Sequence, residues 1–249
     1  MLLASILINP ANEARGIYIP PLIRQNIESF RQWHPGLPHK LFSLQDVLEL
    51  LEDRFPPYVL DAFNALRPYA YKADLARYCI LYEHGGIYAD LSYFFTASIP
   101  VEEKRAVVFR DFLWSSPWDT SVGLISSPPR HKALERAIEL VCDNVKRGYY
   151  GPTSLCPTGP ALFGKALAMA CGAEDLVTGT ALQIDRDSIR RHVPDLDLPD
   201  SEGVHCLTLG DSLMAIKRKR MASPGLTDFG MNNGNAYAEL WEQRRIYVD

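Results

Sequence analysis

Three charged side chains, Asp74, Arg77 and Asp90, are spaced so that they could act together on one polar ligand. Asp74 and Arg77 lie three residues apart in a stretch with helical spacing of apolar residues, so they share a helix face. That face adjoins the apolar stripe of the same helix without belonging to it. Two opposite charges at the border of a core stripe predict that the pair lies at the rim of the fold, partly exposed, rather than in its buried interior.

Asp90 follows this helix across a sharp turn made by two glycines, at positions 85 and 86. A strand is expected from residue 87 to 95, and its side chains alternate between two faces. Tyr88, Asp90 and Ser92 point one way, toward a crevice at the strand end, which is where open α/β sheets bind ligands. A carboxylate there can hold a divalent ion, which in turn can neutralise a leaving diphosphate.

Each feature also has an ordinary structural interpretation. Asp74 and Arg77 would form an exposed pair worth a few tenths of a kcal/mol. Asp90 would cap a strand, and the glycines would end a helix. It is their order and spacing together that favours a functional site.

The elements that must position these residues alternate between helix and strand along the whole chain. Strands are expected near residues 1–8, 40–43, 87–95, 105–110, 122–126 and 204–207. Helices are expected near residues 21–33, 46–54, 58–66, 70–84, 129–146, 161–171 and 236–245. This order predicts an α/β fold, a mostly parallel sheet covered by helices, in a single domain of residues 1–249. Residues 221–249 would form a C-terminal loop and helix near the site.

Composition narrows the class of function. The chain has 249 residues and a formal net charge of −4, and nothing in it suggests the basic face that a nucleic-acid partner would require. Its one dense basic run, residues 217–220, is expected to be a solvated loop, with contact to an anionic membrane surface or to a diphosphate left open. No apolar run is long enough to span a bilayer, and five scattered cysteines predict a reducing, cytoplasmic setting.

The stretch from Lys72 to Ser92 resembles the signature of glycosyltransferase family 32. It reads K-A-D-L-A-R-Y-x-x-L-Y-x-x-G-G-I-Y-A-D-L-S, and residues 158–160, Thr-Gly-Pro, are similar to a second family loop. The resemblance implies a GT-A nucleotide-diphosphosugar transferase fold and sugar transfer with retention of configuration. It also implies that Asp74 and Arg77 contact the donor sugar, and that Asp90 is the first acid of a D-x-D motif beside Tyr88.

The second acid of that motif is replaced by Ser92, a weak ligand for a hard cation such as Mn²⁺ or Mg²⁺. Three outcomes follow. Asp90 and Ser92 could bind the ion together with a further oxygen ligand such as Asn233. Alternatively, the negative charge of the diphosphate could be balanced without a metal, or catalysis could be lost. The resemblance also implies that Trp241 closes over the donor. The alternatives are that the asparagines near residue 233 cap the last helix and that Trp241 packs in the core.

The expected function is transfer of a sugar from a UDP- or GDP-sugar to a hydroxyl of a glycan or other acceptor. Two alternatives are a catalytically impaired sugar-nucleotide-binding protein and a sugar nucleotidyltransferase. Residues 9–16 fit the phosphate loop of the latter class poorly. Asp111 and His205 are weaker candidates, interpreted as a turn residue and a structural histidine.

Overall fold

The computed structural model describes residues 1–8, 18–112, 116–220, 225–231 and 236–248. Within these ranges one nine-stranded sheet has the order β2-β1-β3-β6-β5-β7-β8-β9-β4. The strands are β1 (Leu2–Ile6), β2 (His39–Phe42), β3 (Gly86–Ala89), β4 (Tyr93–Phe95), β5 (Ala106–Arg110), β6 (Leu124–Ser127), β7 (Leu176–Asp185), β8 (Gly203–Leu209) and β9 (Ser212–Lys217).

The α/β class is confirmed, but the sheet is mixed rather than mostly parallel. Among the described strands, β1–β2, β1–β3 and β5–β7 pair in parallel, whereas the other neighbours pair antiparallel. The excess of antiparallel pairs comes partly from β7, β8 and β9, where the sequence pattern predicts only one short strand, near residues 204–207. The β8–β9 hairpin has a two-residue connection, which only antiparallel strands allow.

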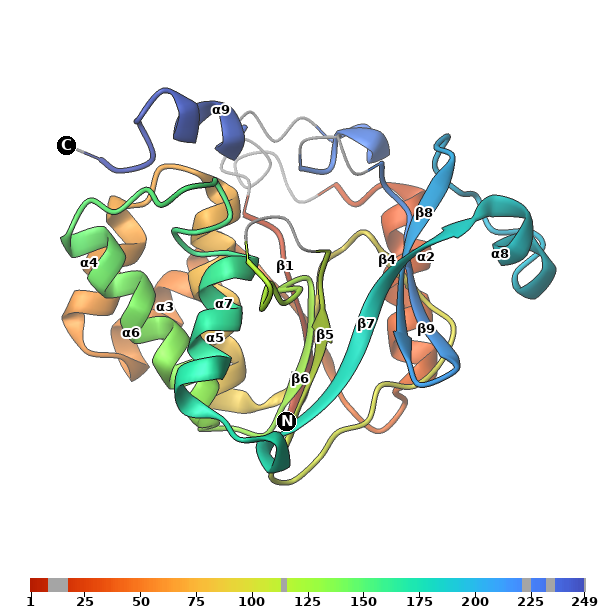
Figure 1. Ribbon diagram of the computed structural model, residues 1–249, viewed down its shortest axis with the longest axis horizontal. Helices are drawn as coiled ribbons and strands as arrows, with labels where there is room; N and C mark the ends of the chain where they lie inside the picture. The colour runs from red at the N-terminus through yellow and green to blue at the C-terminus, as the bar shows by residue number, and fades with distance from the viewer. Residues whose placement is uncertain (9–17, 113–115, 221–224, 232–235, 249) are drawn as a thin grey trace.

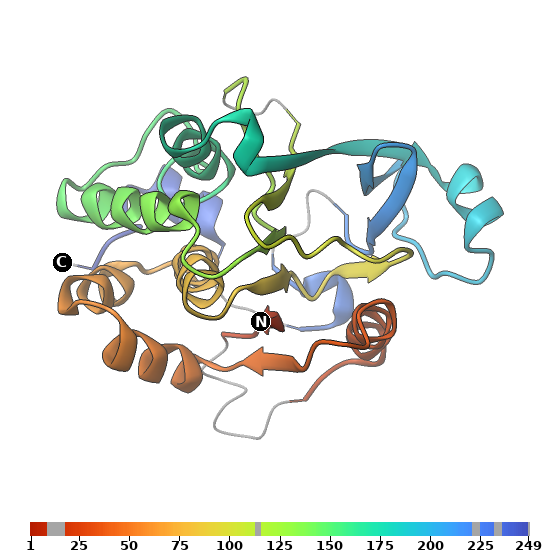
Figure 2. The same ribbon diagram turned by 90° about the horizontal axis from the view of Figure 1, so that it is seen from below.

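Helices cover the sheet on both faces (Figures 1 and 2). The helices are α2 (Pro21–Trp33), α3 (Leu44–Arg54), α4 (Pro57–Ala65), α5 (Tyr69–His84), α6 (Lys132–Lys146), α7 (Pro160–Ala170), α8 (Arg186–His192) and α9 (Tyr237–Glu242), with short 3₁₀ turns η1 (Ala173–Asp175) and η2 (Thr227–Phe229). Ala4 and Tyr88 pack into a cluster with α5, α6 and α7. Leu3 and Ile87 pack on the opposite side, with Phe30 of α2.

Helix α5, which carries Asp74 and Arg77, is buried on nearly all sides. Leu75, Tyr78 and Leu81 are fully buried, and Asp74 and Arg77 are only 7% and 5% exposed. The predicted rim position of this pair is therefore wrong. An apolar stripe describes only the face toward the sheet, whereas α4, α6 and α9 cover other faces of α5.

The expected strand over residues 87–95 is interrupted by a turn and forms two strands. Gly85 and Gly86 adopt positive φ angles of 61° and 109°, and β3 ends at Ala89. The N–H of Asp90 donates to the Gly123 carbonyl at 2.8 Å, and the Tyr93 N–H donates back to the Asp90 carbonyl. Asp90 thus lies in a turn, whereas Tyr88 is part of the hydrogen-bond ladder between strands.

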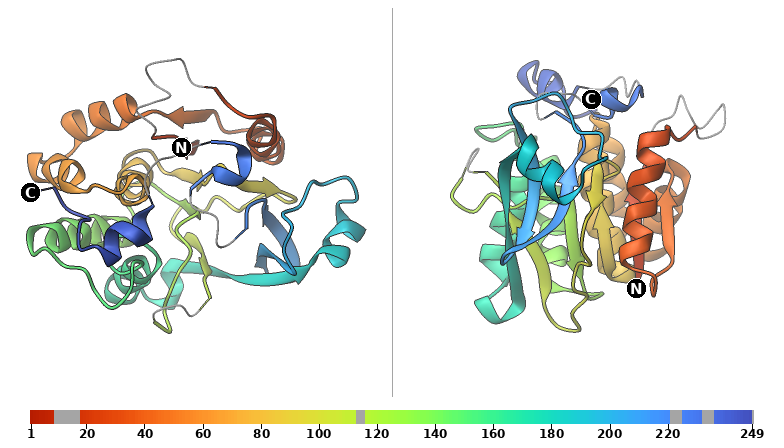
Figure 3. Two further views of the ribbon diagram at one scale, coloured as in Figure 1. Left: turned by 90° about the horizontal axis from the view of Figure 1, so that it is seen from above. Right: turned by 90° about the vertical axis from the view of Figure 1, so that its right-hand side faces the viewer.

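The C-terminal segments α9 and η2 lie along the edge of the sheet toward which β1 runs (Figures 1 and 3). Because β3 is parallel to β1, its carboxyl end and Asp90 face this same edge. The C-terminal part of the chain is therefore placed to cover the predicted site.

No helix of the described residues combines the length and the apolar character that crossing a bilayer requires. All five cysteines are free thiols. A cytoplasmic location stays a prediction.

Candidate functional site

A single guanidinium joins the two carboxylates that the sequence singles out. Arg77 contacts Asp74 through Nη2 at 3.1 Å and Asp90 through Nη1 at 3.2 Å. Its remaining donors reach the carbonyls of Ala73 at 3.1 Å and Val122 at 2.7 Å. Burying this charge is tolerable only because its N–H groups are so widely paired. The arrangement fixes both carboxylates in one place.

Asp74 is held from both sides. Its Oδ2 accepts a 2.7 Å hydrogen bond from the Thr158 hydroxyl, and its Oδ1 pairs with Arg77. Burial raises the pKa of the Asp74 carboxyl to about 6, against the opposing effects of Arg77 and Thr158. Asp74 is therefore an ionised hydrogen-bond acceptor at neutral pH that converts to a neutral acid in mildly acidic solution.

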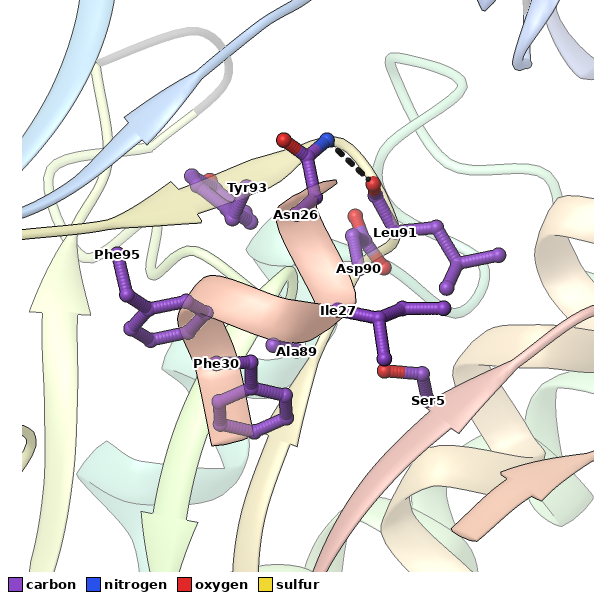
Figure 4. A pocket seen from close by; sticks show the side chains of 9 residues that line it. All are labelled: Ser5, Asn26, Ile27, Phe30, Ala89, Asp90, Leu91, Tyr93 and Phe95. Atoms are coloured by element: carbon purple, nitrogen blue, oxygen red, sulfur yellow. Dashed lines mark hydrogen bonds between the residues drawn. The ribbon is translucent and has the colours of Figure 1, made fainter. Parts of the chain in front are cut away.

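Asp90 is the more open member of the network, with a side chain 31% exposed. Its Oδ1 accepts a 2.8 Å hydrogen bond from the Tyr88 hydroxyl, whose ring lies 4.6 Å below the Arg77 guanidinium. On α2, Asn26 Nδ2 donates to the Leu91 carbonyl at 2.8 Å and so fixes the turn that presents Asp90 (Figure 4). Three separate elements thus set the direction of this carboxylate.

The comparison with protein families decides the character of this region. Residues 20–108 match the model described as a glycosyltransferase sugar-binding region containing a DXD motif. Over these residues the chain is similar to a glycosyltransferase sugar-binding region. This match confirms the resemblance to DXD glycosyltransferases, and family 32 is consistent with it. It covers Asp74, Arg77, Tyr88 and Asp90, whereas Thr158 lies beyond its end.

One curated relative and one solved structure with partial similarity carry glycosyltransferase names. The chain is 30% identical over 131 residues to an uncharacterized glycosyltransferase of Acanthamoeba polyphaga mimivirus, with 47% of each chain covered. It thus spans about half the length of that relative. A solved structure, the PaToxG glycosyltransferase, is 17% identical and superposes with a TM-score of 0.47 over 67% of each chain.

The other residues predicted to bind the donor or a metal are placed differently. Ser92 is only 2% exposed, and its carbonyl accepts a hydrogen bond from the Arg218 N–H. Asn233 lies outside the described residues. Trp241 is half-buried on α9, where its indole N–H donates to the Tyr150 carbonyl at 2.8 Å. This contact is structural, and contact of Trp241 with a donor stays a prediction.

Tyr237, on the same short helix, was missed by the sequence analysis. Its ring lies 5.9 Å from that of Tyr71, at an interplanar angle of 42°. Burial raises the pKa of Tyr237, Asp74 raises it further, and Lys217 opposes the shift, so both charges act on Tyr237. An aromatic ring beside a carboxylate and an ammonium is a suitable wall for a sugar ring.

The basic run over residues 217–220 is not a solvated loop, so that prediction is wrong. Lys217 is the last residue of β9 and is half-buried. Arg218 is 4% exposed, and its guanidinium donates to the Asp197 carbonyl and to the Asn26 side chain. Lys219 is also half-buried, and only Arg220 is exposed, paired with Asp228. A run of like charges in the sequence does not reveal these differences in burial, because neighbouring side chains along a strand point to opposite faces.

His205 and Tyr93 form a second polar pair, and Tyr93 adjoins Asp90. Their rings are 6.3 Å apart, and His205 Nε2 and Tyr93 Oη are buried with no hydrogen-bond partner in the described part of the chain. Burial, with a smaller contribution from Lys217, lowers the pKa of His205 to about 3, so the imidazole is neutral. His205 is therefore buried, as a structural histidine would be, but it is not fully satisfied.

Proposed function

We propose that the protein is a glycosyltransferase that moves a sugar from a nucleotide-diphosphosugar, UDP- or GDP-linked, to a hydroxyl of an acceptor. We further propose retention of the anomeric configuration, on the strength of the family resemblance. The acceptor class is a glycan or another hydroxyl compound.

The observation that carries this proposal is the Arg77 bridge between Asp74 and Asp90 inside a region that matches DXD glycosyltransferases. Sugar hydroxyls are recognised by fixed carboxylates and guanidinium groups. Here the carboxylate oxygens that would accept hydrogen bonds from the sugar are already oriented before any ligand binds, so binding needs little rearrangement. Asp74, deeply placed, would accept hydrogen bonds from the sugar. Asp90, partly open at the edge of the sheet, would bind the ribose end of the donor.

The chemistry of the proposed step is a displacement at the anomeric carbon. The bond between that carbon and the diphosphate oxygen breaks, and its electron pair leaves with the diphosphate. The acceptor oxygen forms the new bond and gives its proton to the departing phosphate oxygen. Asp74 and Arg77 would hold the sugar in place during this exchange, and α9 would limit the access of water.

The direct test is a panel of UDP- and GDP-sugars incubated with the wild-type protein and with Asp90→Ala, with release of nucleoside diphosphate as the signal. Slow hydrolysis of one donor that is lost in Asp90→Ala is the expected result. Glu103→Ala, an exposed carboxylate before β5, serves as the matched control and should hydrolyse as the wild type does. Absence of binding and hydrolysis for every donor would contradict the proposal.

A second candidate, a sugar-nucleotide-binding protein without turnover, is favoured by one observation. Ser92 occupies the position of the second acid and is buried. Binding of a donor without any hydrolysis or transfer would support this candidate, whereas wild-type turnover would exclude it.

A further inference from the structure

The DXD motif implies a divalent cation, but the side chains described in the structure do not form a site for one. Asp90 Oδ1 is engaged by both Arg77 and Tyr88. Ser92 is buried and neutral. Across the described ranges, no three His, Cys, Asp or Glu side chains gather in a metal-binding group. Hard divalent cations require several oxygen ligands, usually with more than one carboxylate.

A cationic side chain stands beside Asp90 instead. Lys217 of β9 pairs directly with Tyr93 of β4, and its Nζ lies 5.3 Å from the centre of the Tyr93 ring. That ring in turn adjoins Asp90. A Cβ added to Gly123 would meet Asp90 Oδ2 at 2.8 Å and Tyr93 Cε2 at 3.0 Å. The cross-strand pair therefore brings an ammonium from the C-terminal hairpin to the turn that holds Asp90.

The charge of Lys217 is maintained by its surroundings. Burial lowers the pKa of the ammonium, but Tyr93, Asp90 and Asp111 outweigh this effect and raise it above its usual value. In the part of the chain that is described, no hydrogen bond or ion pair within contact distance holds this ammonium. It is a charged, half-buried donor that has electrostatic support yet remains available to a ligand.

Lys219 strengthens the positive field on the same side. It lies two residues beyond Lys217, just past the end of β9, whereas Arg218 between them donates to Asn26 of α2. Its Nζ donates to the Gly225 carbonyl at 2.8 Å. Burial, with a contribution from Lys217, lowers the pKa of Lys219 to about 8, while Asp90 and Asp228 oppose this shift, so the charges of Lys217 and Asp90 both act on Lys219.

We propose that Lys217, supported by Lys219, supplies the positive charge that binds and neutralises the diphosphate of the donor, so that the site works without a divalent cation. This inference rests on the proposed function and names the group that completes it. Two phosphates between Asp90 and the lysine pair would receive charge-assisted hydrogen bonds. When the bond to the sugar breaks, the ammonium would stabilise the new negative charge on the diphosphate and keep its own proton.

The test is calorimetric binding of UDP and GDP to metal-stripped protein, in EDTA and then with added Mn²⁺. For the nucleotide that binds, the wild type should show the same affinity within about twofold in both solutions. Lys217→Met should weaken binding about tenfold to a hundredfold, since one hydrogen bond to a charged group is lost. Lys217→Arg should recover most of the affinity. Lys104→Met, at an exposed lysine, should match the wild type.

The outcomes separate this inference from the proposed function. Wild-type binding or turnover that vanishes in EDTA and returns with Mn²⁺ would overturn the inference and leave the glycosyltransferase proposal standing. Unchanged affinity in a folded Lys217→Met protein would also overturn it, with circular dichroism and thermal unfolding as the check on folding. Failure of the wild type to bind any nucleotide would overturn both.

Discussion

The two sides of the site differ in how completely their polar groups are satisfied. On the side of α5 and β3, the Arg77 guanidinium contacts two carboxylates and two carbonyls, and Asp74 is paired on both oxygens. On the side of β9, the one close contact of the Lys217 ammonium among the described residues is the face of the Tyr93 ring. The paired groups of α5 and β3 are held in fixed positions, whereas the Lys217 ammonium of β9 can still pair with an anionic ligand. The following experiments set one side against the other.

Loss of the Arg77 guanidinium is expected to have the largest effect on stability. Arg77→Met leaves Asp74 and Asp90 without their shared counter-charge, and breaking a buried pair in this way costs about 3–5 kcal/mol. Chemical denaturation measures the change. The matched control, Arg220→Met, removes an exposed partner of Asp228 and should cost about 0–1 kcal/mol. Equal costs for the two variants would mean that the α5 network is not the rigid side.

Alanine substitutions at two glycines, one on each side of the site, compare how tightly the backbone is constrained there. A Cβ at Gly86, where φ is 109°, would lie 2.0 Å from the Leu2 carbonyl oxygen, so Gly86→Ala should cost about 3 kcal/mol or more. Gly210, in the β8–β9 turn, has a φ of 57° and nothing within 4 Å of an added Cβ. Gly210→Ala should therefore cost only about 1–2 kcal/mol. Thermal unfolding of both variants would show whether β3 is as tightly constrained as this geometry requires.

Acid should weaken sugar recognition before it affects the lysine side. The pKa of Asp74 is raised to about 6, chiefly by burial, in surroundings that include Arg77, Thr158, Asp90 and Tyr237. Because the ionised form accepts hydrogen bonds, affinity for the sugar nucleotide should fall as the pH drops through about 6. Affinity for the nucleoside diphosphate alone should fall much less over the same range. Equal losses of affinity for the sugar nucleotide and for the nucleoside diphosphate would show that Asp74 does not contact the sugar.

The pH dependence of stability follows with the opposite sign. A carboxyl whose pKa is higher in the folded than in the unfolded protein favours folding below its unfolded pKa, and this contribution is lost as the pH rises through about 6. In Asp74→Asn this part of the pH profile should disappear. Denaturation at several pH values between 4 and 7 would measure it.

How far the sequence predicts the site depends on which side is considered. Asp74, Arg77 and Asp90 lie within 17 consecutive residues, on one helix and the turn after one strand, so their spacing alone placed them together. Lys217 reaches Asp90 only through the β4–β9 pairing, which joins segments more than 100 residues apart. Nothing in a local pattern specifies such a pairing, and the run around Lys217 looked like a solvated loop.

The fold shows the same limit. The order of helices and strands gave the α/β class, and α2 was placed with its observed bounds. Asp74 was expected at a rim because a helical pattern records one buried face, whereas α5 is covered on several. The long strand β7 was missed because most of its side chains are partly or fully exposed, which weakens the apolar alternation that marks a strand.

The most direct test of the account measures, by calorimetry, the binding of one nucleoside diphosphate and its sugar derivative to Asp74→Asn and Lys217→Met. If the two sides of the site hold two parts of one donor, Asp74→Asn weakens the sugar nucleotide about tenfold and leaves the nucleoside diphosphate unchanged. Lys217→Met weakens both ligands by the same factor, because both carry the diphosphate. Equal effects of Asp74→Asn on the two ligands, or no effect of either substitution, would contradict the placement of the donor across Asp74, Asp90 and Lys217.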